Sequence, residues 1–127
     1  MLTEMYRQLI ALLEAAGFTA YAEDAVPPDA SFPFVTLRIE APAPMQGSGA
    51  IVLTGWTRGG SRHRDRLAMA DALLRLVPGA GLKLPLENGL AVLRRADRLS
   101  VTWPESQGAL GAQVRHALRI YGRCDDA

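Results

Sequence analysis

The sequence predicts an α+β domain in which an antiparallel or mixed β-sheet carries two helices packed on one face. Segments 2–16 and 62–77 place apolar residues at helical spacing, which indicates two amphipathic helices. Several other segments alternate apolar and polar residues, as half-buried strands do. Helices and strands do not alternate regularly along the chain, and this argues against a doubly wound parallel sheet.

The length and composition indicate one folded domain over residues 1–127, with an ordered core over 1–122 and a short tail over 123–127. The chain has 127 residues, too few for two independent cores, and 49% of them are hydrophobic. Its net charge of +1 lacks the basic excess of proteins that grip phosphates, so we expect no specific nucleic-acid binding. No apolar run is long enough to cross a membrane.

The charges are unevenly distributed between the two parts of the chain. Residues 1–57 hold two basic and six acidic residues, whereas residues 58–127 hold twelve basic and seven acidic ones. Oppositely charged regions of one chain could attract each other between copies. Thirteen of the fourteen cations are arginines, which suits interfacial pairing but could also reflect genomic base composition.

The N-terminal helix is expected over 2–16 and to end at Gly17, a residue that readily terminates helices. Its apolar stripe is Leu2, Met5, Leu9, Leu12 and Leu13. A short strand over 18–23 follows, and then a proline-rich loop over 24–31.

The middle of the chain predicts two strands and the second helix. Strands are expected over 34–40 and 50–57, joined by an exposed loop over 41–49, with Ile51, Leu53 and Trp56 in the core. Ser61 is a plausible N-cap for the helix over 62–77. The apolar stripe of that helix is Leu67, Ala70, Leu73, Leu74 and Val77.

The last third predicts up to four strands. Segments 81–86 and 90–95 flank Asn88-Gly89, a strong signal for a tight turn. A further strand is expected over 99–103. The segment 111–121 has the clearest alternation in the chain, and it places His116 in register with apolar residues.

The residues that usually carry catalysis or metal binding do not form a convincing group. His63 and His116 have no nearby cysteine or second histidine, so a zinc site lacks ligands. His63 is interpreted as part of a solvated helix start, and His116 as a hydrogen-bonded, half-buried residue. The Gly59–Arg62 segment lacks phosphate-loop spacing, and Cys124 has no catalytic setting. We therefore expect no enzyme activity, no cofactor and no metal.

The candidate functional residues are instead interfacial. The densest charged cluster, near the start of the second helix, has three interpretations: a solvated helix face, a contact with an acidic neighbour, or a phosphate-binding site. Two polar loop residues and two arginines on the outward side of the last strand complete the set. The candidate interface residues are Arg58, Arg62, Arg64, Arg66, Gln46, Ser48, Arg115 and Arg119.

The order of elements resembles a known family of phage structural proteins. After the N-terminal helix come Val26-Pro27 and then Phe32-Pro33-Phe34-Val35-Thr36-Leu37 at the start of the first long strand. A second strand runs from Ile51 to Trp56, followed by a polar turn, a helix with an Ala/Leu stripe and a long amphipathic last strand. This pattern is similar to the tail terminator, or tail completion, proteins of long-tailed phages and prophages (minor tail protein U-like). Gly55 departs from it, since a bulkier residue usually stands there, and a strand glycine indicates a bulge or a close contact.

The resemblance implies a structural virion protein, assembled in the bacterial cytoplasm, that forms a homo-hexameric ring. Such a ring caps the finished tail tube and meets the head–tail connector, without turnover or a cofactor. Two alternatives stay open: a head–tail joining (neck) protein, or a small protein-binding module unrelated to virions.

Overall fold

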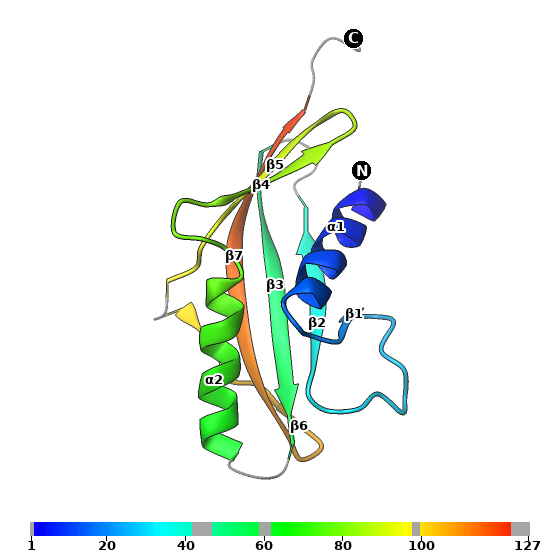
Figure 1. The fold of residues 1–127 in the computed structure, drawn as a ribbon, viewed down its shortest axis with the longest axis vertical. Helices are drawn as coiled ribbons and strands as arrows, with labels where there is room; N and C mark the ends of the chain where they lie inside the picture. The colour runs from blue at the N-terminus through cyan, green and yellow to red at the C-terminus, as the bar shows by residue number, and fades with distance from the viewer. Residues whose placement is uncertain (1, 42–46, 59–61, 98–99, 123–127) are drawn as a thin grey trace.

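A computed structural model describes residues 2–41, 47–58, 62–97 and 100–122 of the chain, the side chain of Arg62 excepted. These residues form two helices and seven strands (Figure 1). In chain order the elements are α1 (Leu2–Ala15), β1 (Ala20–Ala22), β2 (Phe34–Glu40), β3 (Gly47–Thr57), α2 (Arg62–Arg75), β4 (Leu82–Leu86), β5 (Gly89–Arg94), β6 (Glu105–Ser106) and β7 (Ala109–Gly122).

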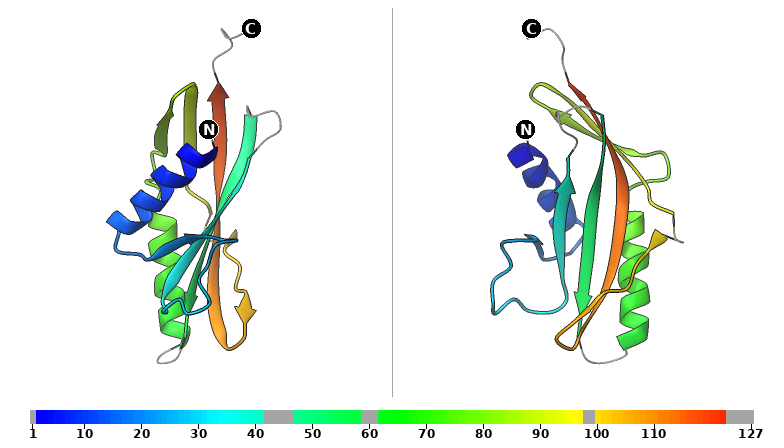
Figure 2. Two further views of the ribbon diagram at one scale, coloured as in Figure 1. Left: turned by 90° about the vertical axis from the view of Figure 1, so that its right-hand side faces the viewer. Right: turned by 180° about the vertical axis from the view of Figure 1, so that it is seen from behind.

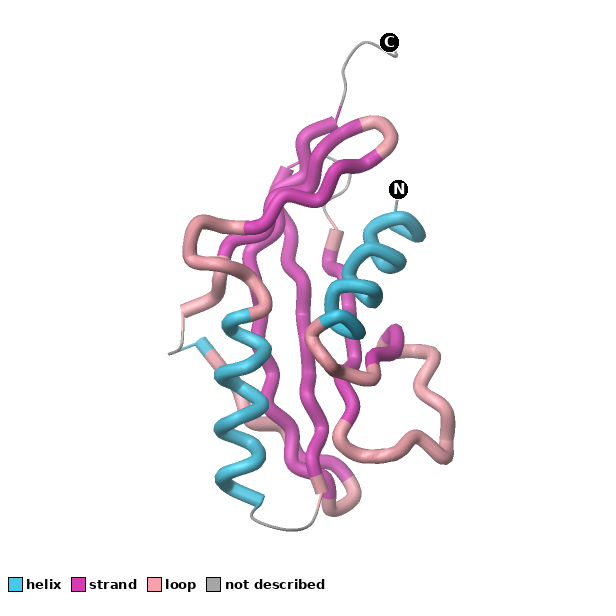
Figure 3. Tube along the Cα trace, in the orientation of Figure 1, coloured by secondary structure: helices cyan, strands magenta, loops and turns pink. Residues whose placement is uncertain are grey.

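The strands form one mixed sheet in the order β1-β2-β3-β7-β5-β4 (Figure 3). Strand β1 runs parallel to β2, and every other pair is antiparallel. The central strand β7 pairs along one side with β3 over eleven residues, from Thr57↔Leu110 to Gly47↔Ile120. Along its other side it pairs first with β6 and then with β5.

Both helices lie on the same face of this sheet, which we call the inner face; the uncovered side is the outer face (Figure 2). Met5, Leu9 and Leu13 of α1 and Leu73 of α2 are at most 1% exposed. They pack in one cluster with the inward residues of the strands, such as Leu53. The predicted α+β class, with two helices on one face of the sheet, is therefore confirmed.

Helix α1 closes the gap between two strands that lie far apart in the sheet. The Tyr6 hydroxyl accepts a hydrogen bond from the Ile39 amide of β2 (3.3 Å). The amide of Gln8 donates to the Pro85 carbonyl of β4 (2.7 Å), and the Glu4 carboxylate accepts from the Glu87 amide (3.2 Å). The sheet therefore curls around α1. Backbone groups of β2, of β4 and of the residue after β4 form hydrogen bonds with side chains of the helix instead of with another strand.

Most predicted elements are present, with shifted ends. Gly17 terminates α1 with a φ of +95°, a conformation that suits glycine. The first strand is shorter than predicted and begins at Ala20. Residues 47–49, predicted as loop, belong to β3 because their backbone pairs with β7.

Two predictions about the elements are wrong. Among the described residues of the predicted strand 99–103, only Thr102 pairs, in a single bridge to Gln113, and the strand in this region is β6. Leu67, assigned to the apolar stripe of α2, is 51% exposed, because the inner side of this turn holds Arg66 instead. The proposed cap Ser61 lies outside the described residues.

Gly55 is explained by a close contact rather than a bulge. Pairing of β3 is continuous on both sides of it, with Val35 on β2 and Ala112 on β7. A Cβ atom at this position would overlap the Met69 side chain of α2. The glycine therefore lets α2 pack directly on the sheet. The prediction that Trp56 lies in the core is wrong, because it alternates with Gly55 in β3, so its half-buried side chain points to the outer face.

Candidate interaction surface

The outer face of the sheet is the surface on which three of the predicted interface residues, Ser48, Arg115 and Arg119, lie. Residues opposite one another in neighbouring strands share a face, so the register defines the rows on this surface. One row is Glu40–Ala50–Ala117–Arg94, and the next is Ser48–Arg119–Val92–Lys83. Small residues occupy the middle of this face, while charged ones stand around them.

An ion-pair network covers the β1–β2 side of the outer face. Arg38 bonds Glu23 (2.9 Å) and Glu40 (3.0 Å), and Arg115 of β7 bonds the other oxygen of Glu40. The bonds to Glu23 and Glu40 raise the pKa of Arg38. The bond from Arg115, assisted by Arg38, lowers the pKa of Glu40 against a smaller opposing effect of burial.

This network also shields apolar surface. Val52 lies between Arg38 and Arg115 in the register and is only 1% exposed, although α1 and α2 both lie on the inner face. Long arginine stems can cover apolar residues while their charged ends stay in water. The acidic side of the outer face is thus already neutralised by partners within the chain.

The opposite side of the outer face carries a cationic patch, which we define as Lys83, Arg94 and Arg119. All three are exposed, and none makes an ion pair with any described residue. The guanidinium of Arg119 donates to the Ser48 hydroxyl (3.2 Å) and lies 5.7 Å from the ring centre of Tyr121. The side chain of Tyr121 is itself 52% exposed.

A shallow groove of about 370 Å³ runs through this patch. Its lining combines Arg94, Arg119 and Tyr121 with small or apolar residues of β3, β5 and β7, among them Gly49 and Val92. A groove lined by two arginines can accept an acidic segment, because a guanidinium group forms strong, often bidentate hydrogen bonds with a carboxylate.

The arginine cluster predicted near the start of α2 lies at the other end of the sheet and is divided by the fold. Arg58 is exposed; it donates to the Gln107 carbonyl (3.1 Å) and its guanidinium carbon lies 4.4 Å from the ring centre of Phe32. Arg64 is exposed, as is His63. Arg62 begins α2.

For Arg66, the prediction of a contact with an acidic neighbour is wrong. It is 8% exposed, and its guanidinium donates to the carbonyls of Gly111 (2.8 Å), Trp103 (3.0 Å) and Pro104 (3.0 Å). Glu105 approaches it at 3.9 Å. Arg66 therefore links residues 103–111 to α2 by hydrogen bonds, and little of the Arg66 side chain is accessible to another molecule.

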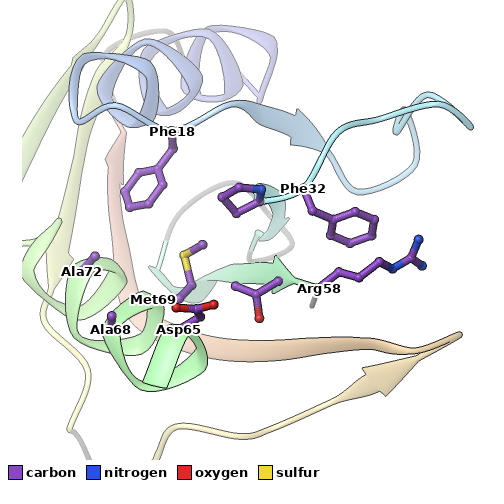
Figure 4. Close-up of a pocket in the computed structure, with 9 residues that line it drawn as sticks. Phe18, Phe32, Arg58, Asp65, Ala68, Met69 and Ala72 are labelled. Carbon is purple, nitrogen blue, oxygen red and sulfur yellow. The ribbon is translucent and has the colours of Figure 1, made fainter. Parts of the chain in front are cut away.

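The apolar groove beside this cluster is lined by Phe18, Phe32, Pro33, Thr57, Arg58, Asp65, Ala68, Met69 and Ala72 (Figure 4). It has a volume of about 440 Å³ and lies between α2 and the segment that leads into β2. Phe18 and Met69 supply apolar walls, and Arg58 and Asp65 stand at its edge (Figure 4). The hydroxyl of Thr57 is engaged, since it donates to the Leu110 carbonyl (3.2 Å).

His116 is a structural residue, and it is more deeply buried than predicted. It is 0% exposed; its Nδ1 accepts from the Ala96 amide and its Nε2 donates to the Leu73 carbonyl, both at 2.9 Å. These two bonds require the neutral ring with its proton on Nε2. Burial, with a smaller contribution from the charge of Arg95, lowers the pKa of His116 despite the bond to Leu73.

Within the described segments, no three His, Cys, Asp or Glu side chains gather as a metal site would need. No helix in those segments is long and apolar enough to cross a membrane.

The structure brings together Ser48, Arg115 and Arg119 of the predicted set and separates them from Arg58 and its neighbours. Gln46 and Cys124 lie outside the described residues. Sequence reasoning missed Lys83, Arg94 and Tyr121. The alternation of the 82–86 and 89–94 strands could have placed Lys83 and Arg94 on outward positions, but not beside Arg119.

Compared with protein-family models, functionally characterised proteins and solved structures, the chain shows no match.

Proposed function

We propose that this protein is a structural ring subunit, a tail terminator that caps a phage tail tube and joins it to the head. The observation that carries the proposal is the outer face, which neither α1 nor α2 covers and which bears exposed charged residues and the exposed Tyr121. An exposed aromatic residue surrounded by charged residues is a pattern found at protein–protein contacts.

The distribution of charge on this face favours a closed assembly of identical copies. Exposed cations that make no ion pair with a described residue lie on β4, β5 and β7, while carboxylates of the same kind lie in the loop that follows β1, at the other edge of the sheet. In a cyclic assembly larger than a dimer, one patch of each copy meets a different patch of the next. A chain with opposite charges at opposite edges meets that requirement.

The element order supports the terminator within the class of ring proteins. Strand β2 begins directly after Pro33, β3 ends just beyond Trp56, and the last strand β7 is 14 residues long. These features correspond to the anchors on which the resemblance to tail terminators depends. The partners of such a ring are its own copies, the tail tube protein and the head–tail connector.

Electron microscopy and mass photometry test this function. The purified chain, alone and mixed with polymerised tail tube protein, is expected to form rings of one discrete mass and to cap tubes at one end. Tubes incubated without the protein are the control and should keep growing. Rings that bind tailless heads but not tubes would indicate a head–tail joining protein, and a chain that binds neither would contradict the proposal.

A further inference from the structure

The loop between β1 and β2 projects from the body of the molecule (Figures 1 and 3). Asp24 and Asp29 are exposed and make no ion pair with any described residue. The loop is nevertheless ordered by two turns, in which the Ala25 amide bonds the Ala22 carbonyl (2.9 Å) and the Ala30 amide bonds the Pro27 carbonyl (3.1 Å). We call residues 23–31 the acidic loop.

The stiffness of the acidic loop makes it a suitable docking element. Pro27 and Pro28 restrict its backbone, so little conformational entropy remains to be lost when it binds. Its two free carboxylates stand on either side of this proline pair. The loop thus presents two negative charges with a small apolar surface between them.

The cationic patch of Lys83, Arg94 and Arg119 is the complementary surface. Two of its three cations, Arg94 and Arg119, line the groove, and Tyr121 in the same lining offers an exposed aromatic ring to the prolines. The acidic residue nearest to it in the same rows, Glu40, is already bound by Arg38 and Arg115. No described residue neutralises the positive charge of the patch, which a second copy could therefore bind.

The two surfaces cannot satisfy each other within one molecule. The acidic loop follows β1 at one edge of the sheet, whereas the patch lies on β7, β5 and β4 toward the other edge. We infer that the acidic loop of one copy docks in the cationic groove of the next copy, forming a head-to-tail contact. This inference rests on the proposed ring assembly, for which it names the contact.

Charge-reversal variants of the full-length chain test the contact. The loop variant is Asp24→Arg with Asp29→Arg, and the patch variant is Arg94→Glu with Arg119→Glu. Each is expected to raise the concentration for half-maximal assembly by at least about tenfold, as measured by sedimentation velocity and mass photometry at low salt. An equimolar mixture of the two variants should restore association, because the reversed loop of one fits the reversed patch of the other.

Matched controls separate this contact from a general effect of charge. Arg7→Glu and Glu14→Arg reverse exposed charges on α1, away from both surfaces, and should leave assembly unchanged. Circular dichroism of every variant should match that of the natural chain. Assembly should also weaken as the salt concentration rises, since the contact is electrostatic.

The outcomes distinguish this inference from the proposed function. A natural chain that stays monomeric at about 100 µM and low salt overturns the contact, even if tail tubes still recruit the protein. Rings that form equally well in both variants also overturn the contact but leave the ring function standing. Association that follows the charge reversals, in a protein that does not cap tubes, supports the contact and contradicts the terminator function.

Discussion

The same strands form both faces of the sheet, but the inner face packs against the two helices, whereas the outer face carries exposed charged residues. In β7 the inward residues Val114 and Leu118 are at most 2% exposed, while the residue that follows each of them, Arg115 and Arg119, is exposed. Side chains alternate across a strand, so one strand can serve a packed core and a free surface at once. This difference indicates that the free energy of unfolding depends mainly on the inner face. Substitutions of exposed residues on the outer face should change association with little loss of stability.

The largest expected effect comes from the inner face of β3. Leu53→Ala should lower the free energy of unfolding by about 3 kcal/mol, because it leaves a cavity beneath the helices. Val52→Ala, its neighbour on the outer face, should cost only about 1 kcal/mol, because the arginine stems above it can close the gap. Urea denaturation of both variants measures the contrast, and equal losses would mean that the two faces are packed alike.

The next prediction compares two arginines of α2. Arg66→Ala should lower the free energy of unfolding by about 2–3 kcal/mol, since three backbone carbonyls lose a charged donor. Arg64→Ala should change it by less than about 0.5 kcal/mol, because Arg64 is exposed. Thermal and urea unfolding provide the measurement, and a stable Arg66 variant would show that the 103–111 region does not depend on this anchor.

The pH dependence of stability should report the burial of His116. Its pKa is lowered in the folded state, so below about pH 6.5 the unfolded chain binds more protons than the folded one. The stabilisation is therefore complete above that pH and is lost as the pH falls toward the folded-state pKa, by at most about 1.4 kcal/mol per pH unit.

Unfolding titrations between pH 5 and pH 8 check this prediction. His116→Gln should remove most of the dependence in that window, whereas His63→Gln, at an exposed position, should retain it. If stability were independent of pH in the natural chain, the neutral, doubly bonded ring would not be the form that the core requires.

The smallest effect is expected on the outer face. Glu40→Gln should lower the free energy of unfolding by less than about 1 kcal/mol, because its ion pairs with Arg38 and Arg115 are partly solvated. About 0.5 M NaCl should reduce the difference further by screening. A double-mutant cycle with Arg115→Gln measures the coupling, and a loss as large as that of Leu53→Ala would contradict the separation of the two faces.

The sequence alone determined the order of the elements and the direction in which most side chains point. Helical and strand periodicities are local properties, so α1, β2, α2 and β7 could be recognised from spacing. The same alternation placed His116 inside and Arg115 and Arg119 outside, before any strand partner was known.

Only the tertiary structure decided which distant residues meet. Arg66 looked like any surface arginine until the 103–111 segment brought three carbonyls to it. The cationic patch needs the pairing of β4, β5 and β7, which no spacing within one strand reveals. Strand pairing and helix packing join residues tens of positions apart, so the contacts that define this surface depend on the register of the whole sheet, whereas periodicity reports only on neighbours in the chain.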